Sequence, residues 1–318
     1  MFEHVCKMRV VAAGLALLCV APAMSAGQQQ VAPAKILVHG HRGSRATRPE
    51  NTLPAFHYAM EHGADVLELD LAVTKDNVLV VSHSPYIVQD PMAKGHERFC
   101  QGPEYPPRTA IHTLTLDEVE KFDCGVGSLI DFPRQVQVPG THVATFDQIL
   151  DLMVGNKIQL NVETKIFMPH PELTPSPEEF VRLIVDAIHR HHADESRIIL
   201  QSFDFRTLKE MRKQDPKIRL SALVNQPAGD GMNGITDHNK DFAHIYEITG
   251  AEIISPEWHL ATPEQVAAVH KLGVQVAPWT CDTTESWQKM VDAKVDAIIS
   301  DDPEALLAWL KTRTPPLH

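Results

Sequence analysis

The sequence predicts an α/β protein, a (β/α)8 barrel with a β-hairpin and a loop-rich insertion after its second strand. The chain has 318 residues, of which 43% are hydrophobic and 22% charged, enough for one barrel domain with a full core. Eight short runs rich in Val, Ile and Leu recur along it, and helical patterns separate most of them. Strands that alternate with helices pair in parallel through helical crossovers, and eight such units favour a closed barrel over an open sheet.

The expected strands, in chain order, are 35–40, 66–73, 157–163, 197–202, 219–224, 252–257, 274–279 and 296–300. Several of the helices between them open with a Ser, Thr or Asp cap and close on Gly or Asn. Thr145 with Gly155, and Thr262 with Gly273, are two such pairs. This punctuation supports the alternation of strands and helices.

The hairpin and the insertion depart from a plain barrel. In residues 72–83, the turn residues Lys75, Asp76 and Asn77 separate two apolar stretches, which is typical of a hairpin. Residues 84–144 are rich in Pro and Gly and lack a sustained period. Because a loop of that length in a compact domain is usually functional, we expect the insertion to govern substrate choice.

The first 26 residues have the order of a secretory signal peptide. Lys7 and Arg9 precede an apolar run, and small residues follow it, with cleavage expected after Ala26 or Ala23. A membrane anchor is the alternative, but the run is shorter than the ~20 residues of a spanning helix. We therefore expect a periplasmic or secreted protein without a stable membrane span after cleavage, and a single barrel domain over residues 35–313.

The net charge of −12, without a Lys- or Arg-rich run, argues against a nucleic-acid partner. The sequence does not indicate an oligomeric state. Beyond the signal peptide, the cysteines are Cys100, Cys124 and Cys281. Cys100 and Cys124 share the loop-rich segment and are the natural pair in an oxidising compartment. Three free thiols are an equal alternative.

Side chains that carry chemistry gather at the expected ends of the first three strands and of the hairpin. Chemistry on this fold sits at the carboxyl ends of the strands. Residues two apart in a strand share one face, as two carboxylates do in the second strand and a carboxylate and a lysine at the end of the third. The set is His41, Arg42, Glu68, Asp70, His83, Glu163 and Lys165.

These residue types fit the cleavage of a phosphodiester. Three buried carboxylates repel one another unless a cation holds them, and oxygen ligands suit one divalent ion, Ca²⁺ or Mg²⁺. Two histidines can exchange protons near neutral pH, and Arg42 and Lys165 can offset charge on the phosphoryl oxygens. The alternatives are satisfied polar residues at strand ends and surface ion pairs.

The motifs HRG (41–43), PENT (49–52), ELD (68–70), TKDNVLVVSH (74–83) and VETK (162–165) resemble those of the glycerophosphodiester phosphodiesterase family. The likeness extends to QSFD (201–204), PW (278–279) and SDDP (300–303), over nearly the whole chain after the signal. The family folds as a TIM barrel with a hairpin and a small insertion after the second strand.

The resemblance implies a role for each matching position. His41 and His83 would be the acid/base pair, Glu68, Asp70 and Glu163 the metal ligands, and Arg42 and Lys165 the phosphate contacts. Glu50 would orient the first loop by binding Arg42 or the waters of the metal, and Thr52 would cap the first helix. Phe203 and Trp279 would wall the glycerol, or else pack at the barrel mouth.

The implied reaction converts a glycerophosphodiester, a small-molecule substrate, to an alcohol and glycerol 3-phosphate. The family commonly has His-Asp after the hairpin, whereas this chain has Ser84 in place of the acid, which leaves substrate choice open. Phospholipase D-like cleavage of lysophospholipids or sphingolipids is a second hypothesis, which an apolar groove around the insertion would favour. A binding protein that does not turn over phosphodiesters is a third.

Overall fold

The computed structural model describes residues 1–2, 35–88, 98, 100–127, 129–225 and 241–318. The expected signal peptide, apart from its first two residues, lies outside them, and so do residues 89–97, 99 and 128 of the insertion. The chain divides into two compact units, Met1–Ala32 and Pro33–His318, and the second contains every helix and strand of the described residues. Among the described residues, no helix has the length and apolar character that crossing a bilayer requires.

Eight parallel strands form the barrel, so the predicted fold class is confirmed. They are β1 (Leu37–Gly40), β2 (Val66–Val73), β4 (Gln159–Thr164), β5 (Ile198–Ser202), β6 (Arg219–Val224), β7 (Ile253–Pro256), β8 (Gln275–Val276) and β9 (Ala297–Ser300). Their spatial order is β8-β7-β6-β5-β4-β2-β1-β9. Backbone hydrogen bonds from Ile299 to Pro278 and from Cys281 to Ile299, both 3.0 Å, join the two ends. Each strand falls within, or within one residue of, an expected apolar run.

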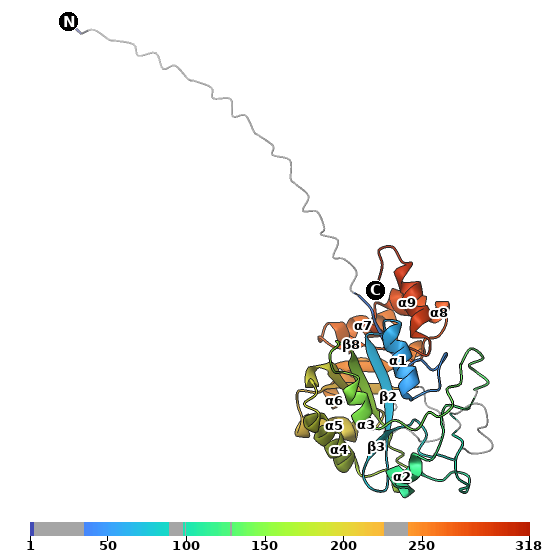
Figure 1. Cartoon of the computed structure of the whole chain (residues 1–318). Helices are drawn as coiled ribbons and strands as arrows, with labels where there is room; N and C mark the ends of the chain where they lie inside the picture. The colour runs from blue at the N-terminus through green and yellow to red at the C-terminus, as the bar shows by residue number, and fades with distance from the viewer. Residues whose placement is uncertain (3–34, 89–97, 99, 128, 226–240) are drawn as a thin grey trace. The chain divides into compact units, whose positions relative to one another are not determined.

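Helices surround the strands (Figure 1). They are α1 (Leu53–Glu61), α3 (Phe146–Asp151), α4 (Pro177–Arg190), α5 (Phe205–Gln214), α6 (Phe242–Thr249), α7 (Pro263–His270), α8 (Thr284–Ala293) and α9 (Pro303–Lys311). Thr145 and Thr262 cap α3 and α7 through their side chains, as expected. Both helices end three or more residues before the glycines expected to close them. Gly155 and Gly273 instead take positive φ of 75° and 77° in the turns beyond.

The main core lies between the strands and the helices, and it determines which way β2 faces. Leu67, Leu69 and Leu71 belong to this core, together with Phe56 of α1 and Phe146 of α3. Successive side chains of a strand point to opposite faces. The residues between these leucines therefore point into the barrel, which is why two carboxylates lie inside it.

The hairpin forms as expected. Strand β3 (Leu79–Val81) runs antiparallel to β2. Asn77 has the positive φ of 62° that its turn requires, and Thr74 N–H donates to the Val78 carbonyl at 3.0 Å. The hairpin thereby returns the chain toward the carboxyl end of the barrel, where the residues that follow β3 can reach the interior.

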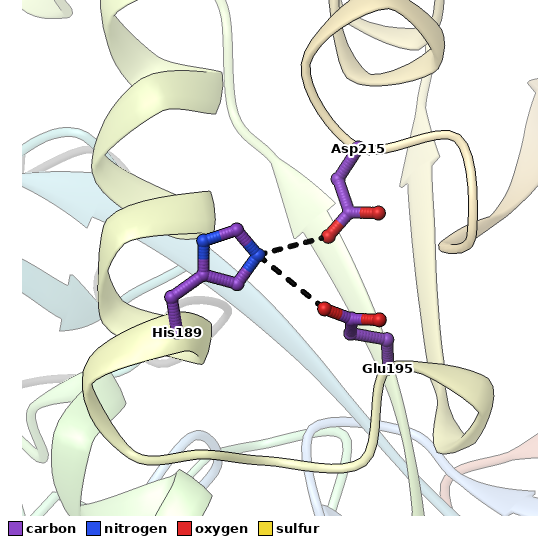
Figure 2. A group of neighbouring side chains, drawn as sticks. All are labelled: His189, Glu195 and Asp215. Carbon is purple, nitrogen blue, oxygen red and sulfur yellow. Dashed lines mark hydrogen bonds and ion pairs between the residues drawn. The ribbon is translucent and has the colours of Figure 1, made fainter.

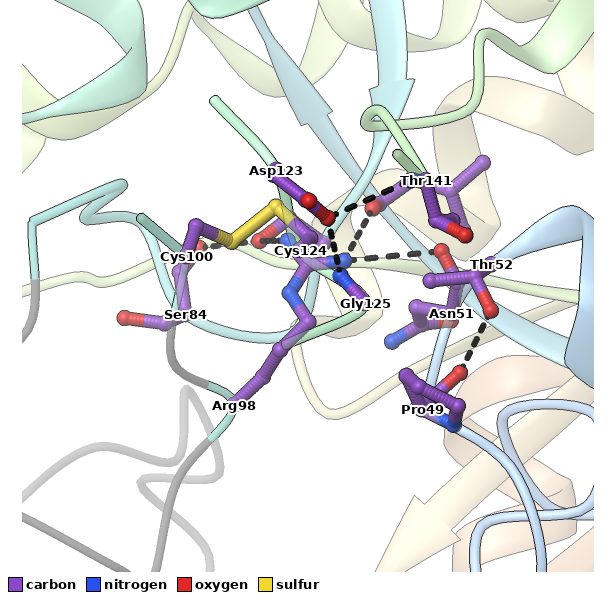
Figure 3. Close-up of a disulfide and its surroundings, with 12 residues drawn as sticks. Pro49, Asn51, Thr52, Ser84, Arg98, Cys100, Asp123, Cys124, Gly125 and Thr141 are labelled. Carbon is purple, nitrogen blue, oxygen red and sulfur yellow. Dashed lines mark hydrogen bonds between the residues drawn. A yellow bond between two sulfur atoms is a disulfide. The ribbon is translucent and has the colours of Figure 1, made fainter. Parts of the chain in front are cut away.

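The insertion has a small hydrophobic core of its own, which includes Ile87, Ile111, Val119, Phe122 and Val143. It contains the short helix α2 (Leu116–Val119) and the 3-10 turn η2 (Ile111–Thr113). Outside the insertion, further 3-10 turns are η3 (Pro171–Leu173), η4 (Glu195–Arg197) and η5 (Trp258–Leu260). A disulfide joins Cys100 to Cys124 in this small core (Figure 3), which decides between the two alternatives for these cysteines. Cys281 is a buried free thiol.

Candidate active site

Two glycines shape the loop after β1. Arg42 and Gly43 have positive φ of 50° and 88°, and a Cβ on Gly43 would lie 2.7 Å from a backbone atom of Ala55. A Cβ on Gly40 would lie 2.1 Å from the Gly43 carbonyl oxygen. The loop closes on itself where Asn51 N–H donates to the Arg42 carbonyl at 3.0 Å. Only glycine lets the chain pass this close to α1 and turn the His41-Arg42 segment into the barrel mouth.

A cavity of about 380 Å³ opens at the carboxyl ends of the strands. Its walls include eight of the ten predicted site residues: His41, Arg42, Glu68, His83, Glu163, Lys165, Phe203 and Trp279. The other two, Glu50 and Asp70, are buried directly behind Arg42, within ion-pair distance of its guanidinium. The structure thus brings together every residue that the sequence analysis selected.

Three buried carboxylates form one cluster at the cavity floor. Glu68, Asp70 and Glu163 each offer an oxygen, and these oxygens lie within 4.8 Å of one another. Burial, together with the charge of Asp70, raises the pKa of Glu68 and of Glu163 to about 8. Without a cation, the cluster therefore resists full ionisation at neutral pH. An all-oxygen set of this kind fits a hard divalent ion.

The cations beside the cluster hold Asp70 ionised. Arg42 Nε lies 3.3 Å from one oxygen of Asp70, and Lys165 Nζ lies 3.6 Å from the other and 2.8 Å from Glu163. Burial alone would raise the pKa of Asp70, but the positive charges of Lys165 and Arg42 hold it far below its usual range. Arg42 is itself fixed by a 2.9 Å hydrogen bond to Glu50, one of the two arrangements expected for that glutamate.

The two histidines have different surroundings. His41 Nδ1 lies 2.5 Å from Asp301 Oδ1, and its Nε2 lies 3.9 Å from Glu68. The Nδ1–H therefore donates to Asp301 and leaves Nε2 for the cavity. Burial, with the positive charges of Arg42 and Lys165, holds the pKa of His83 well below its usual value. His83 is thus a neutral imidazole at neutral pH.

Four residues that hold the predicted set in place were missed by the sequence analysis. Gln201 Nε2 donates to Glu68 at 2.6 Å, and Asn51 Nδ2 donates to Asp70 at 2.8 Å. Arg45 lines the cavity and pairs with Glu50, and Asp301 orients His41. Gln201, Asn51 and Asp301 lie inside the motifs quoted above, and Arg45 lies between two of them. Their positions were visible in the sequence, but their contacts were not.

Ser84, which stands where the family commonly has Asp, is used in a turn. Its hydroxyl accepts a hydrogen bond from Tyr86 N–H at 3.2 Å, and its carbonyl accepts one from Ser82 Oγ at 2.8 Å. Among the described residues, none from 84–144 lines the cavity. The expectation that the insertion governs substrate choice finds no support there. The apolar walls come instead from the loops after β4, β5 and β8, from Leu223 of β6 and from Ile299 of β9.

A second cluster with metal-ligating side chains lies away from the cavity (Figure 2). His189 at the end of α4 points between Asp215 and Glu195, with Nε2 at 3.2 Å and 3.4 Å from their oxygens. The His189 side chain is 53% exposed. Lys217 Nζ also lies 2.8 Å from Glu195. The group is a surface ion-pair network.

The cavity lies where a (β/α)8 barrel carries its chemistry, and the chain is an enzyme of a known family. It belongs to the glycerophosphoryl diester phosphodiesterase family, whose model matches residues 41–305. It is 31% identical over 273 residues to a glycerophosphodiester phosphodiesterase of Caldanaerobacter subterraneus, which covers 86% of this chain and 97% of that one.

Solved structures agree with this assignment. A putative glycerophosphoryl diester phosphodiesterase from Silicibacter pomeroyi is 28% identical, with a TM-score of 0.72 over 87% of this chain and 93% of its own. A phosphodiesterase from Oleispira antarctica, solved with the product sn-glycerol-3-phosphate, is 19% identical with a TM-score of 0.68, over 87% and 98% of the two chains. At 19% identity, the similarity to the Oleispira antarctica structure shows a shared fold only.

Proposed function

We propose that this enzyme hydrolyses glycerophosphodiesters to an alcohol and glycerol 3-phosphate, with one divalent cation and an acid/base pair of histidines. The observation that carries the proposal is the meeting of His41, His83 and the carboxylate cluster around one cavity. Family membership and the product bound to the Oleispira antarctica phosphodiesterase support the same substrate class.

Each histidine has a task that its surroundings suit. His83, a neutral imidazole, accepts the proton of the glycerol hydroxyl that attacks phosphorus. His41, held by Asp301, delivers a proton from Nε2 to the oxygen of the departing alcohol. The attack forms a new P–O bond, which closes a cyclic phosphate, while the P–O bond to the alcohol breaks. Water then opens the cyclic phosphate to glycerol 3-phosphate, with the two proton transfers reversed. Arg42 and Lys165 offset the negative charge of the phosphoryl oxygens.

Glu68, Asp70 and Glu163 would hold the cation, either Ca²⁺ or Mg²⁺. When bound, it would supply Lewis acidity to a phosphoryl oxygen. Gln201 and Asn51 fix the directions of the Glu68 and Asp70 carboxylates by donating to them. This kind of outer support usually tunes a metal site strongly.

The test is release of glycerol 3-phosphate from glycerophosphocholine by the purified protein, first with chelator and then with Ca²⁺ or Mg²⁺ restored. We expect activity to require the cation, and His41→Ala and His83→Ala each to lower kcat about 10²- to 10⁴-fold. His189→Ala on the distant surface network is the matched control and should retain full activity. Intact activity in the double variant of His41 and His83 would overturn the acid/base scheme.

One observation favours the lysophospholipid hypothesis as a second candidate. The cavity has an apolar side formed by Ile166, Phe167, Phe203, Leu223 and Trp279. Phe203 and Trp279 meet edge to face, with ring centroids 5.6 Å apart, and Trp279 Nε1 donates to the Ser255 carbonyl at 2.9 Å. If the enzyme releases choline from lysophosphatidylcholine but releases no glycerol 3-phosphate from glycerophosphocholine, its reaction is the phospholipase D-like cleavage.

We also propose that the mature enzyme works in the periplasm or outside the cell. The order of charged, apolar and small residues over 1–26 supports this, as does the Cys100–Cys124 disulfide, a bond typical of oxidising compartments. Fractionation of cells that express the full chain, with N-terminal sequencing of the product, tests it. Recovery in the cytosol with residue 1 retained would overturn it.

A further inference from the structure

The insertion approaches the back of the active site through one side chain. Arg98 reaches from the chain beside the disulfide toward Asn51 (Figure 3). Its Nη2 donates to Ser82 Oγ at 2.9 Å, and its Nη1 makes longer contacts of 3.3 Å to the Val81 carbonyl and 3.4 Å to the Asn51 carbonyl. One guanidinium therefore connects the end of β3 with the loop that precedes α1.

The contact at Ser82 bears directly on His83. Ser82 Oγ, which accepts the hydrogen bond from Arg98, donates its own to the Ser84 carbonyl at 2.8 Å. This second bond spans His83 and closes the turn that presents its imidazole. Ser82 N–H also donates to the Asp70 carbonyl at 2.9 Å, so the same residue fixes the turn to β2.

The contact at the Asn51 carbonyl places Arg98 beside the residues that hold Asp70 and Arg42. Asn51 Nδ2 donates to Asp70, and the preceding residue, Glu50, holds Arg42. Burial lowers the pKa of Arg98, and the carboxylates of Glu50 and Asp70 oppose this effect. Arg98 lies outside the cavity walls. It does not touch the substrate space and can act only through the residues it holds.

The disulfide fastens the segment that carries Arg98. Cys100 is two residues away and is bonded to Cys124, whose N–H donates to the Thr141 carbonyl at 2.7 Å. Asp123 beside it accepts hydrogen bonds from the N–H groups of Gly125, Gly140 and Thr141. The far end of the tether is thus a well-bonded loop within the small core of the insertion.

We propose that Arg98 is a positioning residue for His83, acting through Ser82, and that the Cys100–Cys124 disulfide holds it in place. The inference rests on the proposed function for its kinetic readout. It gives the insertion a task in the reaction although its described residues do not line the cavity. Small displacements of a catalytic group can cost about 10²-fold in rate.

The experiment compares kcat and KM on glycerophosphocholine for wild type, Arg98→Ala, Arg98→Lys, Ser82→Ala and Cys100→Ser/Cys124→Ser. We expect Arg98→Ala to lower kcat about 10- to 100-fold with KM within about twofold, because Arg42 and Lys165 still bind the phosphate. Arg98→Lys should recover part of the loss. Arg98→Ala combined with Ser82→Ala, or with the cysteine pair, should be less than additive, since the residues act as one unit.

Arg108→Gln, which replaces an exposed arginine of the same insertion, is the control and should leave kcat unchanged. If Arg98→Ala lowers only the melting temperature, with kcat per folded molecule intact, the positioning role is refuted. If the losses of kcat from Arg98→Ala and from Cys100→Ser/Cys124→Ser are fully additive, the disulfide does not act by holding Arg98 in place.

Amide hydrogen exchange separates this proposal from the proposed function. If wild type cleaves none of the phosphodiesters, that function fails, but Arg98→Ala must still speed exchange at residues 51–52 and 81–84 relative to Arg108→Gln. Unchanged exchange there would overturn the proposal independently of activity.

Discussion

Asp301→Asn tests whether the carboxylate behind His41 serves the reaction. The substitution keeps the size of the side chain but removes the charge that lies 2.5 Å from His41 Nδ1. A hydrogen bond to a charged group contributes about 1.5–3 kcal/mol, and about 1.4 kcal/mol corresponds to a tenfold change in rate. We therefore expect kcat to fall about 10- to 150-fold.

The assay is glycerol 3-phosphate release at saturating substrate and cation, with the folded fraction measured by circular dichroism. Asp302→Asn is the matched control, because the neighbouring carboxylate caps α9 and pairs with Arg134 instead of facing the cavity. Because Asn caps a helix about as well as Asp and the lost ion pair is with an exposed arginine, it should cost less than about 1 kcal/mol of stability and leave kcat unchanged. If kcat of Asp301→Asn stays within twofold of wild type, or if both variants lose activity equally, the orienting role is refuted.

Three further predictions concern stability. In chelated protein, Glu68 and Glu163 bind protons up to a pKa of about 8 when folded but only to about 4.5 when unfolded, so the free energy of unfolding should fall as pH rises from about 4.5 to 8. Thermal melts should show this fall of stability with pH in wild type and a weaker fall in Glu68→Gln. Saturating Ca²⁺ or Mg²⁺ should raise the melting temperature more at pH 8 than at pH 5.5. Equal pH dependence in wild type and Glu68→Gln would contradict the raised pKa values. Gly43→Ala should unfold the first loop and abolish activity, because its Cβ would lie 2.7 Å from the Ala55 backbone; an active, stable variant would refute the close approach. Thr52→Ala should lower unfolding free energy by about 1 kcal/mol in urea titrations by removing the cap of α1, whereas Thr52→Ser should retain most of it.

The barrel was predictable because its signals are local. Each strand is a short apolar run and most helices begin at a capping residue. Hydrophobic periodicity and capping residues were therefore sufficient to predict the order of strands and helices. The directions of Glu68 and Asp70 followed from their spacing within one strand. The helix ends of α3 and α7 were placed too late, because a glycine that closes a turn looks in sequence like one that closes the helix itself.

Contacts between distant segments were beyond such signals. Asp301 is a carboxylate in a short polar stretch, and only the pairing of β9 with β1 brings it to His41. Arg98 has no distinguishing neighbour other than Cys100, and its partners at Val81 and Ser82 lie in another element. The role of the insertion in substrate choice stays a prediction for the same reason, since a Pro- and Gly-rich composition does not reveal which face of the barrel a loop covers.

The first and last strands of the barrel are neighbours, so His41 and Asp301 meet across a sequence separation of 260 residues. A ribosome that adds about 5–20 residues per second needs on the order of ten seconds to a minute to make that stretch. Once residue 163 has been added, the nascent chain has His41, His83 and the three carboxylates of the cluster, but His41 still lacks its partner Asp301. Any fragment that ends before β9 should therefore be silent, and the appearance of catalysis in a translation time course marks the moment when the barrel closes.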